Sequence, residues 1–148
     1  MDRYWNKPEQ TREAFSSRVD GWFHTGDFAT IDERGMISIK DRKKDVIISG
    51  GENISSVEVA NTLYGHPDIE RVAVIGIPHE DWGETPKAIV VTADGADLSE
   101  GRVIEFARDN LAHFKCPTVV GFVDELPQTS TGKIRKVELR ESHGGLAE

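Results

Sequence analysis

The sequence predicts an α+β fold, in which a small three-stranded sheet packs against helices and a β-hairpin precedes this core. Three observations support this fold class. Apolar runs of strand length occupy residues 71–77, 87–92 and 119–123, and the first two indicate strands buried on both faces. Segments with helical spacing of apolar residues separate some of these runs. The resulting order of elements predicts one compact α+β layer from residue 41 onward.

Turn-forming residues predict the hairpin at about residues 22–40. The segment DERG separates two strand-like runs, and its Asp and Gly favour tight turns. Residues 1–20 are polar with scattered aromatic side chains, so we expect them to be weakly structured. After a charged break at 41–44, residues 45–49 form a short apolar strand, and the following Gly-Gly pair forces a turn.

Capping signals predict where the helices begin and end. Ser55 and Glu58 form a capping box, and Gly65 ends the helix that follows it. A second helix is expected at about 99–112, where one face is apolar and the opposite face is charged. The apolar stripe of this helix consists of Val103, Phe106, Ala107 and Leu111. A last short helix is expected at 137–141.

Composition limits the possible partners. The net charge of −8 disfavours a nucleic-acid partner, because the phosphate backbone binds basic surfaces. The chain has no apolar run of the ~18 residues that a membrane span requires. Its single cysteine suits a reducing compartment, so we expect a cytoplasmic location. Basic residues nevertheless cluster at 40–44 and 133–136, which suits either a small polyanion such as a nucleotide or an ordinary solvated surface.

The sequence shows no pattern typical of a metal site or a thiol nucleophile. The five histidines lack the spacing of metal ligands. Cys116 is followed by Pro117 and has no base nearby in sequence, so we interpret it as structural. Trp82, in the segment Trp-Gly-Glu, is interpreted as the anchor of a loop.

Polar residues around the hairpin are candidates for binding a nucleotide. Asp27 lies at the end of a strand after a glycine, where its carboxylate can accept hydrogen bonds from a ribose diol or serve in an Asx-turn. Arg42 offers a planar fork of donors for ribose or phosphate oxygens. Asp41 lies at the break between hairpin and core, where a hinge can absorb backbone rotation. The alternative for both is an exposed charged linker.

Two loops carry further candidates. Gly50 and Gly51 either allow a ligand close to the backbone or adopt positive φ in a tight turn. Lys133 lies in LPQTSTGKIRK, where a mobile ammonium can neutralise charge that develops on a transferring phosphoryl group. This segment is no Walker loop, because Pro127 and Ile134 stand where that pattern needs Gly and Ser or Thr. Taken alone, it is also compatible with a surface loop.

The order and spacing of these segments closely resemble the C-terminal part of the acyl- and aryl-CoA ligases of the adenylate-forming superfamily. The similar segments are YWNKPEQT, DGWFHTGD, IKDRKKDVIISGGENISSVEV, HPDIERVAVIGIPHEDWGE and LPQTSTGKIRKVELR. They cover the chain from about Tyr4 to Arg140. The fatty acyl ligases and the plant-type coumarate ligases look most similar, and the resemblance favours a fatty acid as the substrate.

The resemblance implies a two-step reaction with ATP, CoA and a carboxylic acid as substrates. The carboxylate attacks the α-phosphate of ATP to give acyl-AMP and pyrophosphate, and the CoA thiol then displaces AMP. A small C-terminal lid turns about a hinge between the two steps. The implied roles are adenylation for Lys133, ribose binding for Asp27 and Arg42, the hinge for Asp41, and the lining of the CoA channel for Gly50, Gly51 and Glu52.

The resemblance also implies a division of the chain. Residues 1–40 match the end of a large N-terminal domain, residues 41–142 match the lid, and residues 143–148 form a tail. The large domain, with its phosphate loop, adenine pocket and acyl pocket, is not part of these residues, so we expect the chain alone to be inactive. Mg²⁺ is expected in the full enzyme but not bound by this chain.

A second hypothesis is a stand-alone interaction or regulatory module that keeps the lid fold without catalysis. Such a module would dock on a separate large domain or form a homodimer through residues 1–40. The retention of Asp27, Arg42 and Lys133 argues against this hypothesis, since a non-catalytic module would not need them.

Overall fold

The chain forms two compact units in a computed structural model that describes residues 3–15 and 22–145. Unit 1 comprises residues 1–44 and unit 2 comprises residues 45–148. The sequence suggested a division after residue 40, but the second strand of the hairpin continues beyond it. The assignment of the two units to parts of a larger enzyme stays a prediction.

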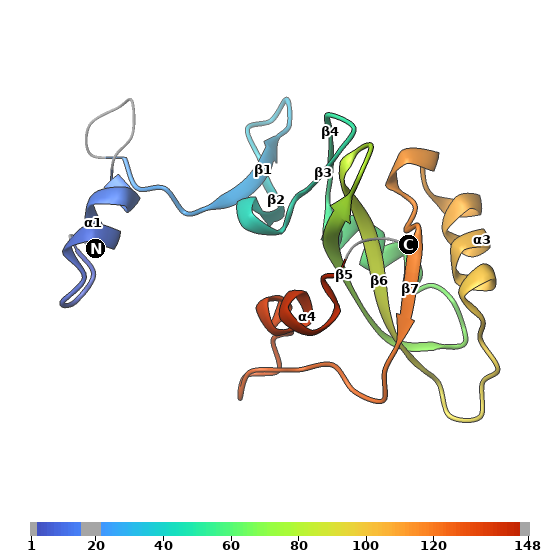
Figure 1. Ribbon diagram of the computed structural model, residues 1–148. Coiled ribbons are helices and arrows are strands. Elements are labelled where there is room, and N and C mark those ends of the chain that lie inside the picture. Colours follow the sequence, from blue (N-terminus) through green and yellow to red (C-terminus); the bar gives the residue numbers. More distant parts are fainter. Residues whose placement is uncertain (1–2, 16–21, 146–148) are drawn as a thin grey trace. The chain divides into compact units, whose positions relative to one another are not determined.

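Unit 1 begins with helix α1, Pro8–Phe15, in the segment that was expected to be weakly structured (Figure 1). A proline suits the first helical position because its missing N–H would have no partner within the helix there. The Thr11 hydroxyl donates to the Lys7 carbonyl at 2.8 Å. The expectation of weak structure is therefore wrong for this helix, and residues 1–2 and 16–20 lie outside the described part of the chain.

The predicted hairpin is present in unit 1. Strands β1 (Asp27–Ile31) and β2 (Ile37–Arg42) pair antiparallel. The turn between them depends on the DERG segment, as expected. The Asp32 carboxylate accepts backbone N–H bonds from Arg34 at 2.9 Å and from Met36 at 2.8 Å, and Gly35 has a φ of +78°.

Unit 2 is built on a five-stranded sheet in the order β4-β3-β6-β5, with β7 pairing in parallel with β6 (Figure 1). The strands are β3 (Ile47–Ser49), β4 (Glu52–Ile54), β5 (Ile69–His79), β6 (Gly83–Thr92) and β7 (Val119–Phe122). Strands β5, β6 and β7 correspond to the three strands of the predicted sheet, and β3 corresponds to the short strand predicted at residues 45–49. The sheet is larger than predicted because the β3–β4 hairpin joins β6 through the single pair of Ser49 and Gly83, which apolar patterning cannot reveal.

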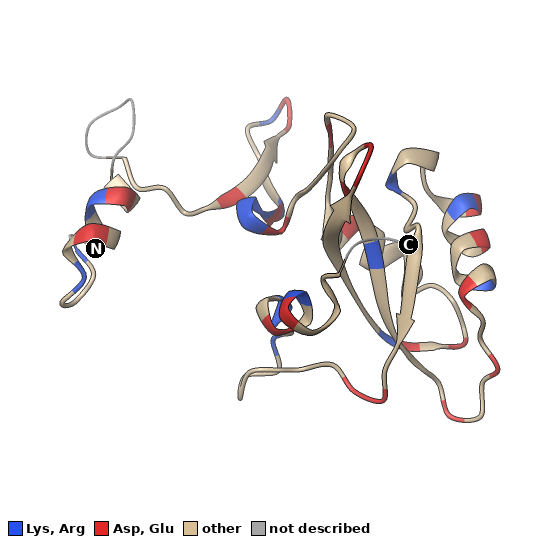
Figure 2. Cartoon of the chain, viewed as in Figure 1, with Lys and Arg blue, Asp and Glu red and all other residues tan. Residues whose placement is uncertain are grey.

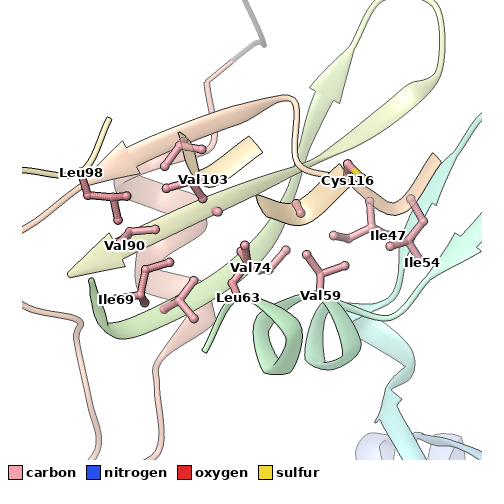
Figure 3. Close-up of a cluster of buried hydrophobic side chains, with 14 residues drawn as sticks. Ile47, Ile54, Val59, Leu63, Ile69, Val74, Val90, Leu98, Val103 and Cys116 are labelled. Atoms are coloured by element: carbon pink, nitrogen blue, oxygen red, sulfur yellow. The ribbon is translucent and has the colours of Figure 1, made fainter. Parts of the chain in front are cut away.

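Helices cover both faces of this sheet. Helices α2 (Ser56–Leu63) and α3 (Glu100–Asn110) pack on one face, where the buried cluster in Figure 3 contains Val59 and Val103. Helix α4 (Lys136–His143) packs on the other face through Leu139. Alternate residues of β5 enter the two clusters because successive side chains of a strand point to opposite faces.

The capping residues and apolar spacing in the sequence predicted the ends of the helices of unit 2 to within a few residues. Ser55 is the N-cap of α2, and its hydroxyl accepts the N–H of Glu58 at 3.2 Å. Helix α3 carries the predicted stripe, with Val103 and Ala107 fully buried and Phe106 and Leu111 partly buried against the same cluster. The last helix extends through His143, so the predicted tail at 143–148 begins inside α4, and its residues 146–148 lie outside the described part.

Candidate functional site

The two residues predicted to bind ribose lie together in unit 1. Asp27 begins β1 and Arg42 ends β2, and the two are partners in the hairpin register. Arg42 Nε lies 3.0 Å from Asp27 Oδ1, and a second guanidinium nitrogen donates to the Thr25 carbonyl at 3.1 Å. A carboxylate can accept about four hydrogen bonds. The ion pair therefore orients Asp27 while leaving it capacity to accept others.

A hollow of about 450 Å³ lies beside this ion pair, lined by Gly26, Arg42, Lys43 and Lys44. Figure 2 shows the basic residues gathered at the short helical turn, Lys43–Asp45, that follows β2. Gly26 has a φ of +75°, and its carbonyl accepts the Lys43 N–H at 2.8 Å. A basic hollow with a carboxylate at its edge has the chemistry to hold an anionic group next to a diol.

Asp41, the predicted hinge residue, is a buried residue of β2. It pairs with Phe28, and the register then shifts so that Lys40 is the extra residue of a β-bulge. The Asp41 carboxylate accepts the N–H of Arg42 at 2.8 Å. A bulge interrupts the regular ladder and bends the strand, which makes this part of β2 irregular.

The predicted channel glycines form the two-residue turn between β3 and β4. Gly50 and Gly51 have φ values of +57° and +87°, the signs that a type I′ hairpin turn requires at both central positions. The Gly50 N–H donates to the Trp82 carbonyl at 3.0 Å, which ties this turn to the β5–β6 connection. The turn by itself accounts for both glycines, so a channel role needs separate support.

A pocket of about 660 Å³ lies beside this turn. It is lined by Ser49, Gly50, Glu52, Trp82, Thr85, Ile104, Arg108, His113, Phe114, Cys116, Pro117 and Thr118. Two aromatic rings and a guanidinium thus face the same cavity as two of the predicted channel residues. The His79 ring stacks on Trp82 with centroids 4.2 Å apart and holds the indole from one side.

The sequence did not reveal this pocket. Trp82 was interpreted only as a loop anchor, and Arg108 and Phe114 carried no prediction. Trp82 is distant in sequence from Arg108 and Phe114, and the pocket exists because residues of α3 and of the segment after it line the same cavity as the β3–β4 turn. Aromatic and basic residues next to loop glycines were the available signal, but nothing in the sequence showed that they meet.

Cys116 also lines the pocket, but its environment disfavours a nucleophile. Its thiol is buried and lies 3.6 Å from the Ala112 carbonyl. Burial raises the pKa of the Cys116 thiol, and the positive charge of Arg108 lowers it by a smaller amount. A raised pKa keeps the thiol protonated and unreactive at neutral pH.

Lys133 follows a tight turn in the loop between β7 and α4. The Thr129 N–H donates to the Lys133 carbonyl at 2.8 Å, and the Thr129 hydroxyl accepts the Lys133 N–H at 3.2 Å. The Gly132 N–H closes the turn on the Thr129 carbonyl at 2.9 Å, with a φ of +80° at Gly132. The backbone of Lys133 is therefore held, while its side chain is exposed to solvent.

Contacts with distant segments fix the helix that follows this loop. Arg140 of α4 pairs with Asp45 at 2.7 Å, and the ammonium of Lys136 donates to the Ser56 hydroxyl at 2.7 Å. Lys87 of β6 donates to the carbonyl of His143, in the last turn of α4, at 3.0 Å. These bonds and the buried Leu139 side chain fasten α4 to the body of unit 2.

The glycine turn and the lysine loop lie at opposite ends of the unit 2 sheet (Figure 1). The structure thus brings Asp27 to Arg42, and Gly50 and Glu52 to the pocket, but it separates this pocket from the lysine loop. Among the described residues, no group of three or more His, Cys, Asp or Glu side chains could hold a metal ion. The same residues include no helix with the length and apolar character to cross a membrane.

The sequence of unit 2 from α2 to the lysine loop matches a known family. Residues 58–133, just over half of the chain, match the model of the AMP-binding enzyme C-terminal domain. The chain therefore belongs to this family, the C-terminal domain of the adenylate-forming enzymes. The family predicted from the sequence motifs is confirmed, and so is the fold class.

Individual relatives narrow the comparison to CoA ligases. The chain is 49% identical over 144 residues to a feruloyl-CoA synthase of Amycolatopsis sp, covering 97% of this chain and 29% of that protein. It is 48% identical over 143 residues to the long-chain-fatty-acid–CoA ligase FadD13 of Mycobacterium tuberculosis, covering 97% of this chain and 28% of that protein.

Solved structures with a similar fold include an ATP-bound protein and an amide bond synthetase, McbA from Marinactinospora thermotolerans, which is 40% identical with a TM-score of 0.83 and covers 97% of this chain and 29% of that one. The crystal structure of ATP-bound MatB from Rhodopseudomonas palustris is similar with a TM-score of 0.87 and 42% identity, covering 96% of this chain and 28% of that one. The 148 residues thus span less than a third of the length of the proteins they match.

Proposed function

We propose that this chain is the C-terminal lid of an ATP-dependent acid–CoA ligase. In the first step a carboxylate oxygen attacks the α-phosphorus of ATP, and pyrophosphate leaves. In the second step the CoA sulfur attacks the acyl carbon, and AMP leaves. The observation that carries the proposal is the presence of the lysine loop and the glycine turn at opposite ends of the unit 2 sheet, in a chain that belongs to this family.

Lys133 is the proposed catalytic residue of the first step. Negative charge develops on the transferring phosphoryl group, and a cation placed there stabilises the transition state. An exposed side chain on a backbone held by hydrogen bonds is suited to enter a site that another domain provides. Asp27 and Arg42 would bind the ribose hydroxyls of the same nucleotide, beside the basic hollow of unit 1.

The pocket beside the glycine turn is the proposed site for CoA. Gly50, Gly51 and Glu52 would line the passage for the pantetheine arm. Trp82 and Phe114 offer flat faces on which an adenine ring can stack, and Arg108 offers a positive charge for phosphate. Because the glycine turn and the lysine loop lie at opposite ends of the unit 2 sheet, the lid would turn about Asp41 between the two steps.

The proposed acid is a fatty acid, in keeping with the similarity to FadD13. Other relatives are named for different acids, including a feruloyl-CoA synthase, a benzoate–CoA ligase and a butyrate–CoA ligase. We further propose that the acyl pocket and the Mg²⁺ site belong to a large domain like that of the longer relatives. The described residues contain no group of three or more His, Cys, Asp or Glu side chains that could hold Mg²⁺.

The experiment that tests the first step uses a fusion of this chain to the large domain of a relative such as FadD13. Lys133→Ala should slow acid-dependent ATP–pyrophosphate exchange about 100-fold or more, because the cation at the phosphoryl group is lost. Thioester formation from preformed acyl-AMP should stay within about twofold, since it does not use Lys133. Equal loss in both half-reactions would refute the assignment.

The second step is tested by Gly50→Asn in the same fusion. An Asn-Gly pair suits a type I′ turn, so the hairpin is kept while a side chain is added near Trp82. Thioester formation should fall about tenfold, equivalent to ~1.4 kcal/mol, and adenylation should not change. Gly95→Asn is the matched control, because Gly95 also has positive φ but does not line the pocket. Unchanged thioester formation would remove the channel role.

A further inference from the structure

Thr129 holds the backbone of Lys133 from both sides. Its N–H donates to the Lys133 carbonyl at 2.8 Å, and its hydroxyl accepts the Lys133 N–H at 3.2 Å. The Thr129 carbonyl is engaged by the Gly132 N–H at 2.9 Å. Of the two bonds to Lys133, the one from the Lys133 N–H therefore depends on the Thr129 side chain, whose hydroxyl is its acceptor.

The flanks of the turn are held by backbone hydrogen bonds that do not involve the Thr129 hydroxyl. Gln128 and Ile134 form a β-bridge, and the Arg135 N–H donates to the Pro127 carbonyl at 2.8 Å. Ile134 also packs against the cluster that contains Leu139 of α4. Removing the Thr129 hydroxyl should therefore leave the loop in place and loosen only the turn that presents Lys133.

We propose that Thr129 is a positioning residue for the adenylation step, acting through the Lys133 backbone. This inference rests on the proposed role of Lys133. A lysine has four rotatable side-chain bonds, so the direction in which it leaves the backbone limits where its ammonium can reach. Since small misplacements of a catalytic group reduce rates strongly, a hydroxyl that fixes this direction should matter for the rate.

The position of Thr131 provides a matched control. The two hydroxyls are 2.9 Å apart and share a hydrogen bond, but it is Thr129 that accepts the Lys133 N–H. Thr129→Val removes that acceptor with little change of shape. Thr129→Ser keeps it. Thr131→Val makes the same chemical change at a hydroxyl that contacts Thr129 and does not accept the Lys133 N–H.

In the fusion with a relative's large domain, Thr129→Val should lower the adenylation kcat about fivefold, in line with one lost hydrogen bond. Thioester formation from preformed acyl-AMP should be unchanged. Thr129→Ser should restore adenylation to within about twofold of the original, and Thr131→Val should have the smaller effect of the two valine variants.

A second measurement uses the 148-residue chain itself. In ¹⁵N relaxation, Thr129→Val should raise the fast motion of the Lys133 amide, whereas Thr129→Ser should not. Unchanged Lys133 motion or unchanged adenylation in Thr129→Val overturns the inference, and so does equal slowing of both half-reactions. If Lys133→Ala is itself not selective for adenylation, the proposed function fails and this inference fails with it. If only Thr129→Val lacks selectivity, Lys133 keeps its role.

Discussion

The strands of the two units differ in how far their apolar side chains are exposed to solvent. Ile39 in the unit 1 hairpin is 68% exposed, whereas Ile75 in the unit 2 sheet is fully buried. The other exposed apolar side chains of the hairpin are Phe28, Ile31, Met36 and Ile37. Both units show strand-like apolar patterns in sequence, but only unit 2 has helices on both faces of its sheet.

This difference shows that a strand pattern does not by itself say what covers the strand. Unit 2 buries the apolar side chains of its long strands β5 and β6 within the described part of the chain. The exposed apolar side chains of unit 1 fit the proposal that this hairpin packs against a large domain, because apolar patches of this kind mark interaction sites.

The largest expected effect compares one isoleucine from each unit. Ile75→Ala should destabilise the chain by about 2–5 kcal/mol, because it leaves a cavity in a packed cluster. Ile39→Ala should change stability by no more than about 0.5 kcal/mol, since its side chain already contacts solvent. Urea unfolding followed by far-UV circular dichroism measures both. Similar losses for the two variants would contradict the comparison.

The next effect concerns the ion pair that joins α4 to the start of unit 2. Arg140 and Asp45 are 30% and 12% exposed, so their interaction is partly shielded from water. A double-mutant cycle with Arg140→Met and Asp45→Asn should give a coupling free energy of about 1–2 kcal/mol.

The control for that cycle is the pair of Arg135 and Glu138, which lies on the exposed side of the same helix. Its coupling should be about 0.5 kcal/mol or less, because exposed pairs gain little. A coupling as large as that of Arg140 and Asp45 would mean that burial does not determine the strength of these pairs.

The smallest expected effect is on the alkylation rate of the Cys116 thiol in unit 2. Because burial raises the pKa of the Cys116 thiol, a smaller fraction is thiolate at pH 8 than in an ordinary cysteine. Alkylation by iodoacetamide should therefore be slower than for glutathione, and its rate should keep rising above the pH at which glutathione levels off.

A matched variant places a thiol in the exposed hairpin. In a Cys116→Ala background, Ile39→Cys should react at a rate within a few-fold of glutathione, because that position is exposed. Equal reactivity of the two positions would show that the unit 2 pocket does not shield Cys116.

Features that depend on neighbouring residues could be predicted from the sequence. The capping box at Ser55, the DERG turn and the apolar stripe of α3 depend on residues a few positions apart, so the sequence contains all that decides them. The same holds for the turn at Gly50 and Gly51, although only the φ values showed that the turn itself requires glycines. The motifs around Arg42 and Lys133 were sufficient to identify the family.

The features that the sequence did not predict depend on contacts between distant residues or lack a local pattern. Helix α1 was not expected because its segment has no apolar stripe, and none of its residues is buried. Strand β4 was missed because it is three residues long and depends on its partner β3. The pocket of Trp82, Arg108 and Phe114 was missed because its walls come from separate segments.

The sequence by itself determined the family, the helix caps, the turns and the position of the candidate lysine, because each depends on neighbouring residues or on a motif. The tertiary structure alone decided which distant side chains meet. Arg140 reaches Asp45 across 95 positions, and Trp82 reaches the Gly50 turn through a backbone hydrogen bond. Such contacts follow from the register of the strands and the docking of the helices, which arise only when the whole domain packs.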